Sequence, residues 1–305
     1  MVPRRAICVS RDGALCSVVE VALASSGVVV DHHDSVPEDT RDVVLVVVDR
    51  ATREAAGGEL RASAAPVVIV GDDLDDDGLI AAMLEAPVSH LVEDPHDRDL
   101  GITSEKLASG DLFGLEKYLV HGAPAGERVI AGDADKRHAM GEVCAWAEAI
   151  GARRPIVHRI ASVVDELMMN ALYDAPARSS ETAGTAADAA AAGRGSEPHT
   201  ILRWGADDQV IAISVSDTFG ALRQRDVIDH VRRARSERGR PRTETQAQRG
   251  AGLGLYLVVA NVASLVVNVE GGQRTEVVCL FDRARAGRPA VSFVRSLHVF
   301  QATAP

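Results

Sequence analysis

Short apolar runs without polar alternation constrain the first part of this chain most. Within residues 4–120 such runs occur at 5–10, 27–31, 43–48, 65–70 and 89–92. Runs of this length are typical of strands that are buried on both faces of a parallel sheet. The segments between them, such as 13–26, have helical character. Strands that alternate with helices predict an α/β unit with a parallel, doubly wound sheet.

The second part of the chain has a different pattern. Two helices are expected at 134–150 and 155–173, followed by a hairpin of strands 200–204 and 209–216. A further helix is expected at 255–265 and a second hairpin at 266–270 and 275–282. We therefore divide the chain into a domain at 1–120, a linker at 121–133 with an entry strand around Val129 as the alternative, a domain at 134–285, and a C-terminal extension at 286–305. Residues 176–199 are rich in Ala, Gly, Ser and Thr, which predicts a flexible insertion.

Composition narrows the cellular setting and the kinds of partner. The net charge of −11 argues against nucleic acid or an anionic membrane as a partner. The four cysteines have no metal-ligand spacing, no apolar run follows Arg4 and Arg5, and no run is long enough to span a bilayer. We expect a cytoplasmic protein with free thiols and no signal peptide. Lysine at only three positions beside abundant arginine suggests a GC-rich bacterial genome.

Glu166 and Asn170 form the first candidate site. They lie four residues apart in the expected helix 155–173, so both side chains share one helix face. An Asn oxygen is a suitable ligand for Mg²⁺ that is shared with substrate phosphates, and a Glu one turn earlier can act as a proton acceptor. The alternative is the solvated face of an amphipathic helix, and the motif alone leaves both interpretations open.

Two later segments carry further candidates. Asp217 follows an apolar strand and is placed to accept a hydrogen bond from the exocyclic amine of adenine; a turn-capping role is the alternative. Gly250, Gly252 and Gly254 directly precede a helical segment, where the backbone can approach phosphate oxygens closely. Neither a dinucleotide-binding fingerprint nor a P-loop fits this segment, because no strand precedes it and no Gly-Lys-Ser/Thr occurs.

Taken together and in this order, these segments resemble the N, G1 and G2 boxes of the Bergerat-fold (GHKL) ATPases, over about residues 130–283. The resemblance implies an α+β two-layer domain that binds ATP and Mg²⁺, with an ATP lid at 221–249. It assigns Glu166 as the catalytic acid or base and Asn170 as the Mg²⁺ ligand. It assigns the remaining nucleotide contacts to Asp217, Gly220, Gly250, Gly252, Gly254, Leu255 and Thr275. Phe219 replaces a glycine of the usual G1 box, and Asp174 stands where many members have His or Lys.

Residues 4–120 resemble a response-regulator receiver domain with a flavodoxin-like fold. Asp49 follows the third expected strand, where receivers carry the phosphorylated Asp. One acid after the first strand, the Ser or Thr after the fourth and the Lys after the fifth are missing, since these positions offer Ser10, Gly71 and Glu93. Without the cation a phosphoaspartate would lack charge compensation. A degenerate receiver-like domain that binds other proteins is therefore the preferred interpretation.

The resemblance implies a bacterial signalling protein, and the two helices before Asn170 are closest to the anti-sigma serine kinases. Histidine kinases usually carry a His followed by Glu and Pro, which His138 lacks. We expect a kinase that acts on Ser, Thr or His of a partner such as a sigma factor, an antagonist or a response regulator. A non-catalytic module that captures a partner when ATP is bound, and a simple ATPase, remain as alternatives. Homodimer formation stays open.

Overall fold

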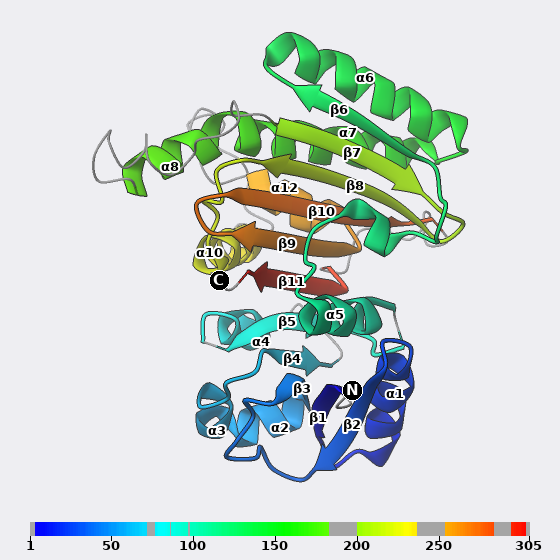
Figure 1. The fold of residues 1–305 in the computed structure, drawn as a ribbon. Helices are drawn as coiled ribbons and strands as arrows, with labels where there is room; N and C mark the ends of the chain where they lie inside the picture. The colour runs from blue at the N-terminus through cyan, green and yellow to red at the C-terminus, as the bar shows by residue number, and fades with distance from the viewer. Residues whose placement is uncertain are drawn as a thin grey trace. The chain divides into compact units, whose positions relative to one another are not determined.

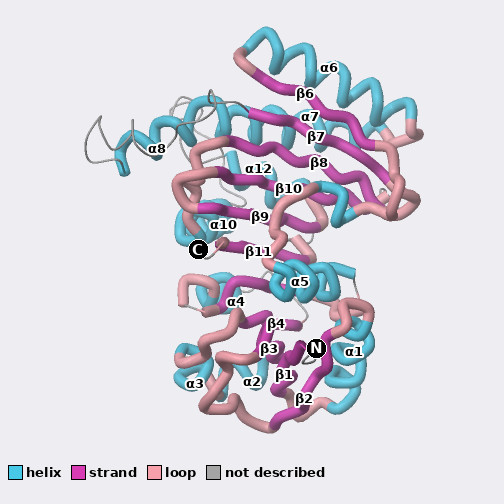
Figure 2. Tube along the Cα trace, in the orientation of Figure 1, coloured by secondary structure: helices cyan, strands magenta, loops and turns pink. Residues whose placement is uncertain are grey.

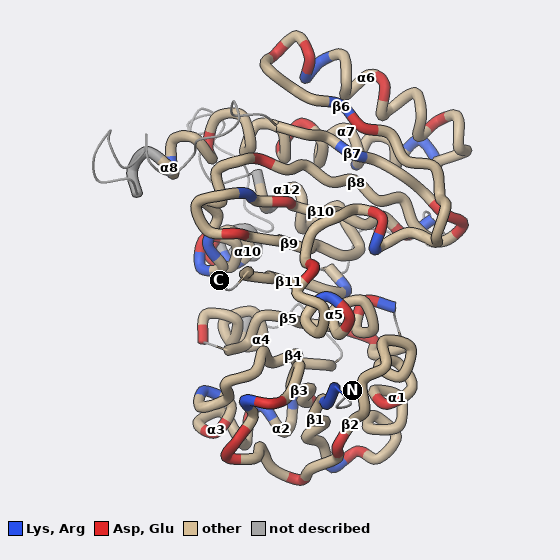
Figure 3. The backbone as a smooth tube through the Cα atoms, in the orientation of Figure 1, with Lys and Arg blue, Asp and Glu red and all other residues tan. Residues whose placement is uncertain are grey.

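The computed structural model describes residues 4–71, 77–85, 87–96, 98–182, 200–236, 254–283 and 294–302. It is a mixed α/β fold, and the chain divides into two compact units (Figure 1). Unit 1 comprises residues 1–112 and 295–299, and unit 2 comprises residues 113–294 and 300–305. Acidic and basic residues are interspersed over both units (Figure 3). No helix in the described ranges has the length and apolar character needed to cross a membrane.

Unit 1 is built on a parallel sheet with the strand order β2-β1-β3-β4-β5. These strands are β1 (Arg4–Val9), β2 (Val28–His33), β3 (Val43–Asp49), β4 (Val67–Val70) and β5 (Val88–Val92). The central strands β3 and β4 are almost entirely buried because helices cover both faces of the sheet (Figure 2). The short apolar runs of the sequence thus become strands close to their expected bounds.

Helices connect the strands of unit 1. They are α1 (Gly13–Ala24), α2 (Arg50–Ala55), α3 (Gly57–Arg61), α4 (Asp77–Ala82) and α5 (Arg98–Ser109). Helices α1 and α5 pack against each other. The beginning of β11 (Ser296–Gln301) lies antiparallel to β5, so part of the expected C-terminal extension completes this sheet.

Unit 2 contains an antiparallel sheet with the strand order β9-β10-β8-β7-β6. The strands are β6 (Ala125–Ile130), β7 (Thr200–Ala206), β8 (Val210–Asp217), β9 (Ser264–Glu270) and β10 (Arg274–Asp282). Helices α6 (Asp133–Ala149), α7 (Arg154–Met169) and α12 (Gly254–Asn261) pack with α7 in the middle, behind the sheet in the view of Figure 1. This places the helices in one layer and the strands in another.

Unit 2 begins earlier than the sequence suggested. The single turn η1 (Leu115–Tyr118) packs on β7 and β8, and the N–H of Gly114 donates to the buried carboxylate of Glu276 at 2.9 Å. Residues 113–120 therefore belong to unit 2 and not to the first domain. Likewise, the expected linker 121–133 contains the edge strand β6, in line with the strand expected around Val129.

Candidate functional site

Helix α7 carries Glu166, and Asn170 follows directly after its last residue. Its buried residues recur at helical spacing from Ile156 to Met168, and Pro155 lies in its first turn, where a missing N–H costs nothing. At Asn170 the helix changes to the π-helical turn η2 (Asn170–Asp174), in which the N–H of Ala175 donates to the carbonyl of Asn170. Helix α8 (Ala175–Thr182) follows directly. Single π turns within helices are frequent at functional sites.

A cavity lies between this bulge and the sheet. Its lining side chains come from α7, η2 and α8, from β8 and β10, and from the loop after β8: Leu167, Asn170, Ala171, Ala175, Arg178, Val215, Asp217, Leu222, Thr275 and Val277. Asn170, Asp217 and Thr275, which the sequence assigned to one nucleotide site, thus line one cavity. The cavity has a volume of about 30 Å³, which is room for one or two water molecules.

Asp217 is the charged group at the end of β8 and is only 8 % exposed. Its carboxylate accepts a hydrogen bond from the N–H of Phe219 at 2.8 Å. Burial raises the pKa of Asp217 from 3.8 to about 6, although the N–H groups of Phe219 and Gly220, the charge of Arg178 and the hydroxyl of Thr275 act in the opposite direction. A buried carboxylate with a strongly raised pKa in a cavity is a mark of a functional site.

Thr275 lies directly opposite Asp217 in the register of β8 and β10. Its side chain is buried, and its hydroxyl oxygen makes no hydrogen bond of normal geometry within the part of the chain that the structure describes, although it acts on the neighbouring carboxylate of Asp217. An unsatisfied buried hydroxyl costs about 1–3 kcal/mol. A bound molecule or an ordered water would satisfy it, so the orphaned hydroxyl fits a ligand-binding cavity.

Gly220 fixes the loop that follows Asp217. Its φ of +57° lies in the left-handed region, and a Cβ at this position would come within 2.1 Å of the carbonyl oxygen of Glu270. The carbonyl of Gly220 in turn accepts a hydrogen bond from Gly272 at 3.2 Å. Only glycine therefore lets this loop lie against the β9–β10 turn.

Glu166 lies one turn before Asn170 and does not line the cavity. Burial raises the pKa of the half-buried Glu166, and the charges of Asp165 and Asp174 raise it further, whereas Lys136 lowers it. Lys136 is itself buried and forms an ion pair of 2.8 Å with Asp165. The charge of Asp174 thus contributes to making Glu166 a stronger base than an ordinary glutamate.

The glycine-rich segment is only partly described. Gly254 opens α12, whose second residue Leu255 is buried, while Gly250 and Gly252 lie outside the described residues. Of the expected lid 221–249, the structure describes α10 (Gln224–Ser236), which packs on α12. In the expected flexible insertion 176–199 it describes residues 176–182, and these are helical, because they form all but the first residue of α8.

Asp49, the aspartate that the sequence compared with the phosphorylated Asp of receivers, makes hydrogen bonds that stabilise the structure of unit 1. One carboxylate oxygen of Asp49 accepts a hydrogen bond from the N–H of Thr52 at 2.6 Å and so caps α2. The other oxygen accepts a short hydrogen bond from the hydroxyl of Ser10. Asp49 therefore stabilises a helix start and holds two neighbouring segments together.

Sequence reasoning missed Arg178, which lines the cavity beside Asp217. Its charge acts on that carboxylate and lowers the pKa of Asp217. The signal was present in the sequence, because Ala171, Ala175 and Arg178 recur at helical spacing after Asn170. This spacing was not used because the composition of residues 176–199 predicted a flexible insertion rather than a helix.

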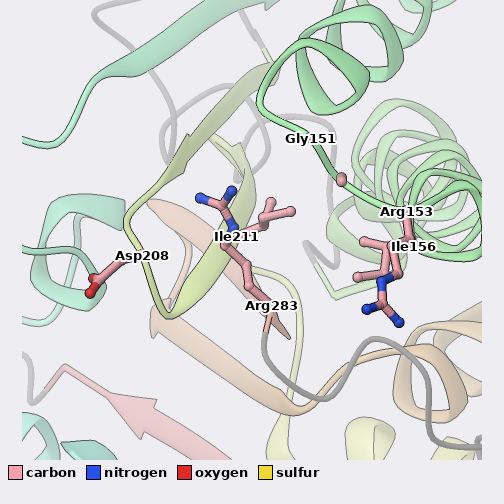
Figure 4. A pocket seen from close by; sticks show the side chains of 7 residues that line it. Gly151, Arg153, Ile156, Asp208, Ile211 and Arg283 are labelled. Atoms are coloured by element: carbon pink, nitrogen blue, oxygen red, sulfur yellow. The ribbon is translucent and has the colours of Figure 1, made fainter.

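A second and larger cavity of unit 2, of about 430 Å³, contains none of the predicted site residues (Figure 4). It lies at the start of α7 and is lined by Arg153, Ile156, Ile211 and Arg283, among others. The guanidinium of Arg283 donates to the carbonyls of Asp207 at 2.6 Å and Ile150 at 2.8 Å. This arginine joins the β7–β8 turn to the end of the α6 segment.

The sequence matches no protein-family model, and a search among curated proteins finds no relative.

Proposed function

We propose that unit 2 binds ATP together with Mg²⁺, with the cavity of Asn170, Asp217 and Thr275 as part of the adenine and metal site. The observation that carries this proposal is that these three side chains, far apart in the sequence, line the same cavity. The order of segments that suggested a Bergerat-fold domain is accompanied by an antiparallel sheet with a helical layer. Both features support that assignment.

The chain's residues have distinct roles in this proposal. Asp217 accepts a hydrogen bond from the exocyclic amine of adenine. The hydroxyl of Thr275 supplies a second polar contact in the same cavity. Asn170 offers an uncharged oxygen ligand for Mg²⁺. Gly254 and Leu255 at the start of α12, together with Gly250 and Gly252, border the phosphates at a helix N-terminus. Bound ATP supplies the phosphoryl group that is transferred.

We further propose that the protein is a cytoplasmic bacterial signalling kinase of the anti-sigma or histidine-kinase type that acts on a partner protein. The raised pKa of Glu166 supports a proton acceptor beside the metal ligand Asn170. The strand order 2-1-3-4-5 of unit 1 is that of flavodoxin-like receivers. The capping role of Asp49 supports a receiver-like unit that contacts proteins without phosphotransfer.

Calorimetric titration with ATP and with GTP, each with and without Mg²⁺, tests nucleotide binding. ATP should bind more tightly than GTP, because guanine presents a carbonyl where adenine presents an amine. Asp217→Asn should weaken ATP binding, whereas Asp208→Asn in the exposed β7–β8 turn should not. Equal affinities for ATP and GTP, or unchanged ATP affinity in Asp217→Asn, would remove the assignment of the adenine site.

Radiolabelled ATP incubated with partner proteins that are encoded near the gene tests the kinase step. Label on a partner that depends on Glu166 is the expected result. Tight ATP binding without any labelled protein would favour the alternative in which ATP only orders the module for partner capture.

A further inference from the structure

The cavity lined by Asn170, Asp217 and Thr275 is too small for the nucleobase that the proposed function requires. Its volume is about 30 Å³, whereas pockets for small molecules usually measure about 300–1,000 Å³. A purine can therefore enter only if a lining group moves. Most lining side chains are short or belong to the strands and the buried face of α7. Arg178 differs from them, because it is long, charged and carried by α8.

Arg178 also has a reason to stay in the cavity. Its positive charge lies near the carboxylate of Asp217, which is held in a buried position. A buried carboxylate is stabilised by a nearby cation, so the charge of Asp217 favours a position of Arg178 in the cavity. Ala175 and Arg178 of α8, which follows the π-helical turn Asn170–Asp174 directly, line the same cavity as Asn170.

We infer that Arg178 competes with the nucleobase for Asp217, so that nucleotide binding requires Arg178 to leave the cavity. This inference rests on the proposed ATP site and adds a residue that sets its affinity. The charge of Arg178 neutralises the same carboxylate that would accept the adenine amine. Because the guanidinium and the base occupy one space, they exclude each other. The side chain of Arg178 is then the group that moves when the site is filled.

Removal of the guanidinium should tighten binding of any ligand that carries the base. Attraction between a partly exposed cation and a carboxylate is worth about five-fold in affinity. In calorimetric titrations of the full chain, Arg178→Ala and Arg178→Gln should bind ATP and adenosine about five-fold more tightly than wild type. Arg178→Lys should lie between, and Arg128→Ala on the exposed edge strand β6 should match wild type.

Inorganic triphosphate separates a base competitor from a phosphate ligand. A competitor for the base predicts the same affinity for triphosphate in wild type and in Arg178→Ala. Weaker binding of ATP and triphosphate by Arg178→Ala would show that Arg178 contacts phosphate and would overturn the inference. Unchanged adenosine affinity in Arg178→Ala and Arg178→Gln would also overturn it.

The same titrations distinguish this inference from the proposed function. If wild type binds ATP and the Arg178 variants bind it no better, the inference alone fails. If no variant binds ATP, the proposed function fails and the inference fails with it. If wild type binds ATP weakly, and Arg178→Ala and Arg178→Gln bind ATP clearly more tightly, the proposed function and the inference are both supported. Tryptophan fluorescence during urea unfolding checks that the variants are folded, since both tryptophans, Trp146 and Trp204, belong to unit 2.

Discussion

Asp217→Asn should stabilise unit 2 at neutral pH while it impairs the proposed site. The carboxylate is buried, and burial raises the pKa of Asp217 from 3.8 to about 6. Each pKa unit corresponds to about 1.36 kcal/mol, so the ionised form costs the folded state up to about 3 kcal/mol at pH 7. Asparagine keeps an oxygen that accepts the N–H of Phe219 but carries no charge. Its gain in unfolding free energy should therefore approach this value.

The pH dependence follows from the direction of the pKa shift. Because the pKa of Asp217 is raised in the folded state, that state binds a proton more tightly than the unfolded state between about pH 4 and pH 6. The stability of wild type should thus increase as the pH falls through this window. Urea unfolding at pH 7, 6, 5 and 4, followed by tryptophan fluorescence, should show an advantage of Asp217→Asn that falls below about 1 kcal/mol near pH 4.

A matched control is Asp208→Asn, since the side chain of Asp208 is exposed. It should change the unfolding free energy by less than about 0.5 kcal/mol at every pH. If Asp217→Asn destabilises unit 2 at pH 7, or if its advantage is the same at pH 4 and pH 7, the carboxylate is not held at a cost, and the argument from burial is wrong.

Three further predictions concern single residues. Asn170→Ala should lose most of the Mg²⁺-dependent gain in ATP affinity, whereas Glu166→Ala should keep binding and lose phosphoryl transfer; titration and radiolabel assays in which both behave as wild type would contradict this. Gly220→Ala should lower the unfolding free energy in urea by more than about 2 kcal/mol, because its φ is +57° and its Cβ would meet a carbonyl, while Gly271→Ala, which points into open space, should not. Beryllofluoride with Mg²⁺ should leave the melting temperature unchanged, and Asp49→Ala should lower stability by about 1 kcal/mol through loss of the α2 cap; a beryllofluoride-dependent rise that requires Asp49 would show a working receiver.

Local pattern predicted most of the secondary structure because periodicity reports burial directly. The apolar run 43–48 can bury the side chains on both of its faces only between two layers of helices, and it forms β3. The helical spacing of apolar residues in 155–168 likewise predicted the buried face of α7. The resemblance that the order of motifs carries assigned Asn170, Asp217 and Thr275 to one site, and all three line one cavity.

Features that depend on distant partners could not be predicted in this way. The segment around Gly114 looked like the end of the first domain, because its hydrogen bond to Glu276 joins residues that are far apart in sequence. The π turn at Asn170 has no local signature, since one extra residue in a helical turn leaves the apolar pattern almost unchanged. Arg178 was overlooked for a related reason: α8 is a helix in a stretch whose composition resembles a linker.

The polar groups of the cavity argue for a ligand more strongly than any single motif does. A core that served stability alone would place apolar side chains where Asp217 and Thr275 lie, because a buried charge and an unsatisfied hydroxyl both cost free energy. Arg178 and the neighbouring hydroxyl of Thr275 offset part of the cost of Asp217, but that hydroxyl makes no hydrogen bond of normal geometry within the described residues. A molecule with an amine for the carboxylate and a further polar group for the hydroxyl would satisfy both at once. The same cavity that is costly without a ligand is therefore well suited to hold one.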